Sequence, residues 1–157
     1  NYFEANPVLV EQRHPNVTYI TARGENLPFE DKFSQLAIID NVLDHTEEPS
    51  VILNESYRVL KDNGILYVGV NIRSMWGTFL HKLINIFNID SAHPHEYDYT
   101  KITHLLFYNN FDIKWETCEN RKNVIKENFQ RKGFKGKAKV ILGLSEFYYE
   151  AFCKKMH

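Results

Sequence analysis

Short apolar runs and helical stripes in this chain predict strands alternating with helices. Residues 36–40 (Leu-Ala-Ile-Ile-Asp) are apolar until the final acid, which is typical of a strand buried on both faces of a parallel sheet. Residues 65–70 (Ile-Leu-Tyr-Val-Gly-Val) predict a second buried strand. Between them, Pro49 opens a helix whose apolar residues repeat every three or four positions, and Gly64 lies just beyond its end. We therefore expect a strand, helix, strand crossover over residues 36–70.

Three further segments alternate between apolar and polar residues, which predicts strands. Residues 17–22 alternate β-branched and aromatic side chains with smaller ones. Residues 111–118 and 146–154 alternate in the same way, with Cys118 and Cys153 inside them. We expect these last two strands to pair antiparallel with each other at the edge of the sheet.

Two helices are predicted in the second half of the chain. Residues 75–87 carry an apolar stripe, which favours a helix packed on the sheet, or alternatively a lid or a cap on the substrate side. Thr100 is expected to N-cap the other helix, with Asn109 or Asn110 in the left-handed turn that ends it. Residues 121–139 hold eight basic residues against one acid and give no clear element.

Composition narrows the class of protein. With 157 residues, 43% of them hydrophobic and 14% aromatic, the chain can bury one core, so we expect a single domain over residues 1–157 with a possible substrate-side insertion at 72–99. A net charge of -1 gives no overall attraction to nucleic acid or anionic membrane. No apolar run reaches the roughly 18 to 20 residues that span a bilayer, and two cysteines without metal spacing favour a reducing cytoplasm.

Three blocks carry a family resemblance. In order, they are residues 24–29 (Gly-Glu-Asn-Leu-Pro-Phe), 41–45 (Asn-Val-Leu-Asp-His) and 58–64 (Arg-Val-Leu-Lys-Asp-Asn-Gly). Their sequence and spacing resemble class I S-adenosylmethionine-dependent methyltransferases of the type 11-like kind. The resemblance extends through 92–95 (Ala-His-Pro-His) and 110–113 (Asn-Phe-Asp-Ile). It implies an α/β fold: a partial Rossmann-like sheet, mostly parallel with an antiparallel C-terminal edge strand, taken from the family strand order 3-2-1-4-5-7-6.

The resemblance also implies a reaction and a cofactor. Family members transfer a methyl group from S-adenosylmethionine to an acceptor, here expected to be a small molecule, and release S-adenosylhomocysteine. The positions that match the family's adenine-binding turn and the loop at the methionine end of the cofactor are Gly24, Glu25, Asn26, Leu27, Asp40, Asn41, Val42 and His45. His45 is also a weak candidate for a catalytic base. Arg23 stands where the family often has an aspartate, and an arginine side chain cannot accept a hydrogen bond from the adenine amine.

The acceptor side of the resemblance lies between residues 71 and 99. Its candidate substrate residues are Asn71, Trp76, His93, His95 and Tyr97. The same segment could instead offer metal ligands, because two histidines spaced by two lie on one face of a strand and two acids follow them. The family resemblance favours a substrate loop and no metal.

One part of the family pattern is missing from these residues. No glycine-rich turn follows an apolar strand, and residues 133–136 (Gly-Phe-Lys-Gly) lie in the basic stretch and do not replace it. We expect an N-terminally truncated domain in which either residues 17–22 pair with residues 36–40 or a second copy of the chain covers the gap in a homo-oligomer. Two other functions stay open: a non-catalytic methyltransferase-like remnant, and an RNA-directed methyltransferase that uses residues 121–139.

Overall fold

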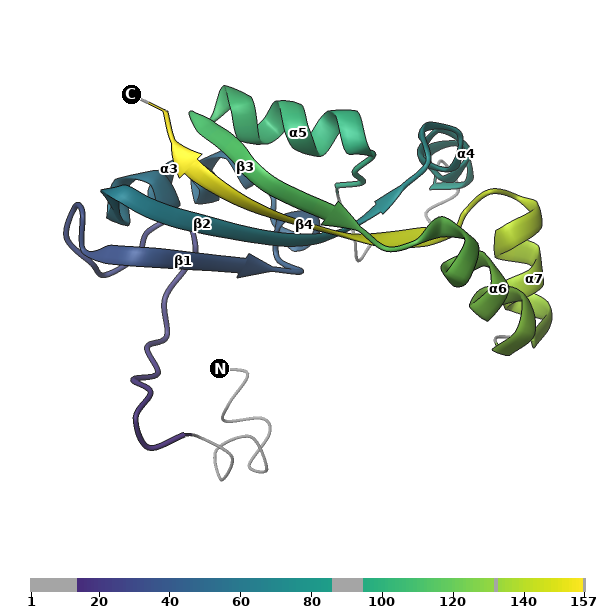
Figure 1. The fold of residues 1–157 in the computed structure, drawn as a ribbon, viewed down its shortest axis with the longest axis horizontal. Coiled ribbons are helices and arrows are strands. Elements are labelled where there is room, and N and C mark those ends of the chain that lie inside the picture. The colour runs from purple at the N-terminus through teal and green to yellow at the C-terminus, as the bar shows by residue number, and fades with distance from the viewer. Residues whose placement is uncertain (1–13, 86–94, 132, 157) are drawn as a thin grey trace.

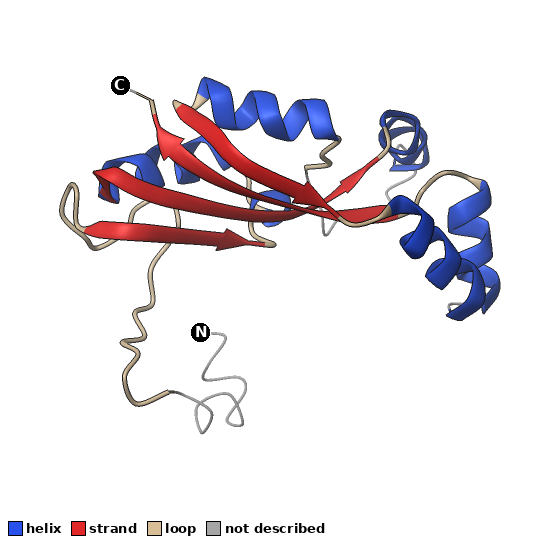
Figure 2. Ribbon diagram, viewed as in Figure 1, coloured by secondary structure: helices blue, strands red, loops and turns tan. Residues whose placement is uncertain are grey.

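The computed structural model describes residues 14–85, 95–131 and 133–156, and it contains a four-stranded sheet (Figures 1 and 2). The strands lie in the order β1 (Ser34–Asp40), β2 (Leu60–Arg73), β4 (Glu146–Lys155) and β3 (Phe111–Cys118). β1 pairs parallel with β2, and β4 runs antiparallel to both of its neighbours. β1, β2 and β3 therefore point the same way, and their carboxyl ends meet at one edge of the sheet.

The predicted α/β class and the antiparallel last strand are confirmed, but β4 is not an edge strand. It lies between β2 and β3, as in the 5-7-6 part of the family order, and β3 forms the edge. The reason is the length of β2, which pairs with β4 without interruption from Ile65 opposite Lys154 to Arg73 opposite Glu146. β4 is thus hydrogen-bonded to a neighbouring strand on each side, to β2 and to β3.

The predicted crossover is confirmed as β1, α3 (Pro49–Val59) and β2. β2 begins directly after α3 and is longer at both ends than the predicted residues 65–70. The expectation that β1 is buried on both faces is wrong. Ile39 is 6% exposed, whereas Ile38 on the opposite face is 64% exposed, because no described residue covers that second face.

The core lies on the face of the sheet that α3 and α5 (Tyr99–Tyr108) cover (Figure 2). Alternate residues of β2 and their partners on β4 point into it, as the period of two in a strand requires. These fully or nearly fully buried residues are Leu66, Val68, Val70, Ala151, Cys153 and Tyr149. The two helices also contact each other, since the amide of Asn109 donates to the hydroxyl of Ser50 over 3.3 Å.

The other face of the sheet carries a row of side chains across all four strands. Ile38 is opposite Tyr67, Tyr67 is opposite Phe152, and Phe152 is opposite Trp115. Three of them are 39% to 64% exposed in the described part of the chain. The predicted strand at residues 17–22 is absent: this exposed segment has no ladder partner, so it does not pair with β1. A second copy covering β1 stays a prediction.

The helix after β2 differs from the expectation. α4 (Met75–Asn85) forms where a helix was predicted, but its apolar stripe does not pack on the sheet. Trp76 and Phe79 are 62% and 55% exposed, whereas Gly77 and Thr78 face inward. The backbone of Gly143 lies where a Cβ at Gly77 would be, so this side of the helix is the one that packs. The remainder of the predicted helix lies outside the described residues.

The ends of α5 confirm one prediction and correct another. Asp98 is the N-cap rather than Thr100, and its carboxylate accepts a hydrogen bond from the Lys101 N–H over 2.9 Å. The first backbone N–H groups of a helix have no partner within it, and an N-cap side chain two or three residues earlier accepts hydrogen bonds from them. Asp98 lies at this position, whereas Thr100 is already inside the helix. Asn110, with φ of 63°, provides the left-handed turn after the helix.

The basic stretch that gave no prediction folds as two helices, α6 (Arg121–Arg131) and α7 (Gly133–Ile141). They lie with α4 beyond the carboxyl ends of β1, β2 and β3 (Figure 1). A short 3-10 helix, η1 (Leu43–His45), follows β1. Among the described residues, no helix is both long and apolar enough to span a bilayer.

Candidate cofactor and acceptor site

The end of β1 turns sharply at Asn41, which has φ of 51°. Asparagine tolerates this left-handed conformation better than most residues. The Asn41 N–H donates to the carbonyl of Gly69 on β2 over 2.9 Å, and the Asn71 amide donates to the Asn41 side-chain oxygen over 3.2 Å. Two of the predicted site residues, Asn41 and Asn71, therefore lie in contact at the carboxyl edge of the sheet, where open α/β sheets bind ligands.

Asp40 is held in place from two strands away. The Tyr148 hydroxyl on β4 donates a hydrogen bond to the Asp40 carboxylate, crossing β2 above Gly69. A Cβ added at Gly69 would lie 2.1 Å from the Tyr148 hydroxyl oxygen and 2.8 Å from Asp40 Oδ1, so the contact requires glycine there. Burial and the bond to Asp40 raise the pKa of Tyr148 above its usual range. Tyr148 therefore stays a neutral hydrogen-bond donor to Asp40.

The 3-10 helix after Asn41 is fixed by the segment before α5. The Tyr97 hydroxyl donates to the Leu43 carbonyl over 3.2 Å, and the His95 ring lies 2.9 Å from the Glu47 carbonyl. Burial raises the pKa of Tyr97. On η1 itself, His45 Nε2 lies 3.6 Å from Asp44 Oδ2, and the His45 side chain is 46% exposed. The imidazole is thus accessible beside a buried carboxylate.

A cavity of about 240 Å³ opens beside these residues, and Arg73 is the one arginine or lysine in its described lining. Arg73 ends β2, is 12% exposed and forms ion pairs with Glu96, at 2.5 Å, and with Glu146. The lining combines predicted acceptor-side residues with residues that were not predicted: Asp44, Asn71, Arg73, His95, Glu96, Tyr97 and Glu146. Asn71, His95 and Tyr97 therefore line one cavity, and their contact with a substrate stays a prediction.

The turn at residues 24–29, predicted to bind adenine, is anchored to α3. The Leu27 N–H donates to Glu55 over 2.8 Å, and Arg58 donates to the carbonyls of Leu27 and Phe29 as well as to Glu55. This corrects one detail, because the Leu27 amide is already bonded within the protein and is not free for a ligand. The turn itself closes through the Asn26 N–H to the Arg23 carbonyl at 3.1 Å.

The Arg23 side chain has no acceptor atom to offer adenine, and it forms an ion pair with Glu25 at 3.6 Å. Gly24 packs closely on α3, since a Cβ there would lie 3.2 Å from Ile52. The residues of the turn that remain on the surface for a ligand are Asn26, which is exposed, and Gly24 and Glu25, which are half-buried. Their role in binding adenine stays a prediction.

Two predicted acceptor residues do not join this arrangement. Trp76 is exposed on α4, with its ring 5.9 Å from Phe79, and it does not line the cavity. His93 lies outside the described residues. The two acids of the alternative metal site have other roles, because Asp98 caps α5 and Glu96 pairs with Arg73. Within the described ranges, no group of three or more His, Cys, Asp or Glu side chains could hold a metal ion.

Sequence reasoning missed Arg73, Glu146 and Tyr148. The predicted second strand stopped at residue 70, three positions before Arg73, so nothing marked that arginine as the end of a strand. The last strand was expected to pair with residues 111–118 alone, which gave no reason to place Tyr148 near Asp40. Pairing of β4 with β2 is what brings these three residues to the site.

Comparison with known proteins agrees with this geometry. Residues 4–68 match the sequence profile of a methyltransferase domain family, a span that includes the turn at 24–29, β1, η1 and α3. The structure is similar to a proposed methyltransferase of Bacillus halodurans C-125, with a TM-score of 0.64 and 18% identity over 98% of this chain and 78% of that one. It also resembles an S-adenosylmethionine-dependent methyltransferase of Methanosarcina mazei, with a TM-score of 0.60 and 18% identity over 94% and 75% of the two chains. Residues 4–68 of this chain thus match a methyltransferase domain family, and the solved structures share the fold of the chain.

Two further matches show how far this similarity extends. A curated relative, an uncharacterized protein of Methanocaldococcus jannaschii, is 36% identical over 67 residues, which is 43% of this chain. The chain spans 31% of the length of that relative. Another structural neighbour is the [4+2]-cyclase SpnF, with a TM-score of 0.63 and 15% identity over 99% of this chain and 62% of that one. The fold therefore hosts more than one named reaction, and the activity must be argued from the site.

Proposed function

We propose that this chain forms part of an S-adenosylmethionine-dependent methyltransferase that acts on a small-molecule acceptor. The observation that carries the proposal is the meeting of exposed polar side chains at the carboxyl edge of β1 and β2. Asp40, Asn41 and Asn71 are all exposed there, and Asn71 also lines the 240 Å³ cavity. Methyl transfer requires the cofactor and the acceptor to be bound next to each other. The proposed cofactor edge and the cavity have this arrangement.

The residues at this edge fit part of the cofactor. Asp40 and Asn41 offer a carboxylate and an amide to the polar groups at its methionine end, with the half-exposed apolar Val42 beside them. Gly24, Glu25 and Asn26 would hold the adenine end. Bound S-adenosylmethionine supplies an electrophilic methyl group on a sulfonium. β1 is the edge strand of the described sheet. The residues named here therefore contact the cofactor from the side of β1 and β2 only.

The protein's own contribution is mainly positioning. Tyr148 fixes the Asp40 carboxylate, and Asn71 fixes the Asn41 side chain, so both are oriented before a ligand arrives. Arg73 and its two carboxylate partners shape the acceptor cavity. His45 is the candidate for removing a proton from the acceptor, since its ring is accessible and lies against Asp44.

Isothermal titration with S-adenosylhomocysteine tests the proposal. We expect measurable binding to the wild-type chain and a loss of about tenfold or more in affinity for Asp40→Asn, because a charge-assisted hydrogen bond is removed. The matched control is Asp112→Asn, an exposed carboxylate on β3 that pairs with Lys114, and it should bind like the wild type. Absence of binding by a folded wild-type chain would contradict the proposal.

One observation favours the alternative of a non-catalytic methyltransferase-like domain. The Leu27 amide, which the family resemblance offers to adenine, is bonded to Glu55. If that bond persists, adenine loses one contact, and binding to the remaining turn is weaker. The same titration separates the two functions, since a non-catalytic domain shows no binding that depends on Asp40. Use of α6 and α7 to bind RNA, and a cytoplasmic location, stay predictions.

A further inference from the structure

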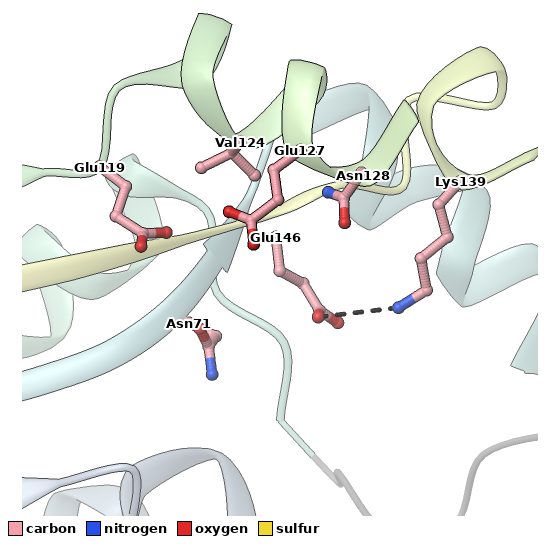
Figure 3. Close-up of a pocket in the computed structure, with 7 residues that line it drawn as sticks. All are labelled: Asn71, Glu119, Val124, Glu127, Asn128, Lys139 and Glu146. Carbon is pink, nitrogen blue, oxygen red and sulfur yellow. Dashed lines mark ion pairs between the residues drawn. The ribbon is translucent and has the colours of Figure 1, made fainter. Parts of the chain in front are cut away.

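A second cavity, of about 190 Å³, lies under α6 next to the first one (Figure 3). The two cavities share Asn71 and Glu146, so they adjoin at the end of β2. From α6, the side chains at positions i, i+3 and i+4 face the second cavity, as expected for one helical face. Its complete described lining is Asn71, Glu119, Val124, Glu127, Asn128, Lys139 and Glu146.

The charge around this cavity is negative. Three glutamates and one lysine line it. Glu146 is already matched by cations, since it pairs with Arg73 and lies 3.7 Å from Lys139. Glu119 accepts a hydrogen bond from the Tyr148 N–H over 2.9 Å, but within the described parts of the chain it has no cationic partner. The Glu119 carboxylate is therefore the group at this cavity that can attract a cationic ligand.

Asn128 provides an independent indication of a ligand. The residue is 6% exposed, its side-chain amide has no hydrogen-bond partner among the described residues, and the amide atoms are not among the fully buried ones. Figure 3 shows this amide pointing from α6 into the cavity, on the same side as Glu146. Because these atoms are accessible from the cavity, a group bound there can form hydrogen bonds with them. A ligand with N–H donors would satisfy the Asn128 oxygen.

The arrangement suits an organic cation rather than a metal ion. The carboxylates surround the cavity without converging, and no group of three or more described acidic, histidine or cysteine side chains could coordinate a metal. An ammonium group differs from a metal ion in binding through directional N–H bonds to separate oxygens. A cavity of 190 Å³ is small compared with the roughly 300 to 1,000 Å³ of drug-sized sites, so the ligand group is small.

The second cavity is connected to the cofactor edge through two residues. Asn71 lines both cavities and bonds to Asn41. Tyr148 bonds to Glu119 through its backbone N–H and to Asp40 through its hydroxyl. A molecule held in the second cavity therefore lies next to residues that position the end of β1. We propose that this cavity binds the ammonium group of the methyl acceptor, which makes the acceptor a small organic amine; this rests on the proposed function.

A pair of matched probes tests the assignment. 1,4-Diaminobutane carries two ammonium groups at neutral pH, and 1,4-butanediol has the same length with neutral hydroxyls. We expect the diamine to bind the wild-type chain, with and without saturating S-adenosylhomocysteine, and to shift the side-chain amide signals of Asn128 in an NMR titration. The diol should cause neither effect, and added salt should weaken the binding of the diamine.

Two variants should change the affinity in opposite directions. Glu119→Gln removes a charge but keeps an oxygen that can accept from the Tyr148 N–H, and it should weaken diamine binding by about fivefold or more. Lys139→Gln removes the competing cation and should tighten binding by about threefold. Glu48→Gln, an exposed glutamate before α3, is the control and should leave the affinity unchanged.

Equal affinity for the diamine and the diol, or no effect of Glu119→Gln, would overturn the inference. The S-adenosylhomocysteine titration on the same sample keeps the two proposals apart. Cofactor binding without selectivity for the diamine removes the ammonium site and leaves the proposed function intact. Selective diamine binding without cofactor binding supports the ammonium site and overturns its role as an acceptor site.

Discussion

The Tyr148 hydroxyl donates a hydrogen bond to the Asp40 carboxylate, although the two residues lie on strands separated by β2. The bond crosses above Gly69, where the lack of a side chain leaves room for it. The antiparallel strand β4 therefore does more than extend the sheet. It orients a carboxylate at the end of β1, on the edge where we propose that the cofactor binds.

Gly69→Ala should break this contact. The new Cβ would lie 2.1 Å from the Tyr148 hydroxyl oxygen and 2.9 Å from its ring carbon Cζ, so the tyrosine must move away. We expect a loss of about 1 to 3 kcal/mol in the free energy of unfolding, measured by urea denaturation. Gly24→Ala, whose Cβ would meet the flexible end of Ile52 at 3.2 Å, should lose less.

A double-mutant cycle identifies the cause of that loss. Tyr148→Phe removes the hydroxyl, so Gly69→Ala should be less damaging in this background by about 0.5 kcal/mol or more. Additive effects of the two changes would show that the hydroxyl is not what the Cβ displaces.

Arg58 should stabilise the turn at residues 24–29 in a pH-dependent way. Its hydrogen bond to Glu55 lowers the pKa of that carboxyl group. A lowered pKa means that the stabilisation is present above the usual glutamate range and is lost as the pH falls. We expect Arg58→Met to lower the urea concentration at the unfolding midpoint at pH 7, with a smaller difference from the wild type near pH 3.

The control for Arg58 is a second basic residue with an acidic partner on the surface. Lys32 pairs with Asp62 at 2.8 Å, and the two side chains are 60% and 53% exposed. Exposed pairs contribute little, so Lys32→Met should leave the urea midpoint close to that of the wild type. A loss for Arg58→Met that stayed constant across pH would contradict the role of ionised Glu55.

Asn41 should prefer glycine to alanine as a substitute, because its φ of 51° is unfavourable for a residue with a Cβ. Both changes remove the hydrogen bond from Asn71, so the difference between them reports on the backbone alone. We expect Asn41→Ala to be less stable than Asn41→Gly by about 1 kcal/mol in thermal or urea unfolding. At the exposed β2 residue Asn63, glycine should instead be the less stable choice.

The two cysteines should differ in reactivity. Burial raises the pKa of the Cys153 thiol to about 12, whereas Cys118 is exposed. At pH 8, Ellman's reagent should label one thiol quickly and the second at the rate of unfolding, and Cys118→Ser should abolish the fast phase. Because the pKa of Cys153 is raised, its contribution to stability is full below the ordinary thiol range and declines as the pH rises toward 12. Two equally fast thiols would contradict the packing of β4.

Local patterns in the sequence predicted the crossover well. An apolar run, a proline, a helical stripe and a glycine specify β1, α3 and β2 with little help from the rest of the chain. The same holds for Asn110, because asparagine tolerates the left-handed turn that ends α5. The candidate cofactor residues at 40–45 were predicted by position, since they follow a strand that a local pattern identifies.

The failures concern contacts between distant segments. Residues 17–22 have the composition of a strand, but strand formation requires a partner ladder, and the sequence does not show whether one is present. Tyr148 and Arg73 reach the site because β4 pairs with β2. Alternation within residues 146–154 predicts a strand but does not identify its neighbour. Residues 121–139 are so rich in basic side chains that no helix was predicted there. The helical face that places Asn128 in the cavity was therefore not predicted.

Backbone amide NMR with S-adenosylhomocysteine tests the central proposal most directly. We predict that saturating ligand shifts the amide signals of residues 24–26 and 40–45, at the two loops beside the carboxyl edge of β1. Signals of β3, on the far edge of the sheet, should stay unchanged. Shifts confined to other parts of the chain, or none at all in a folded protein, would contradict the assignment of this edge as the cofactor site.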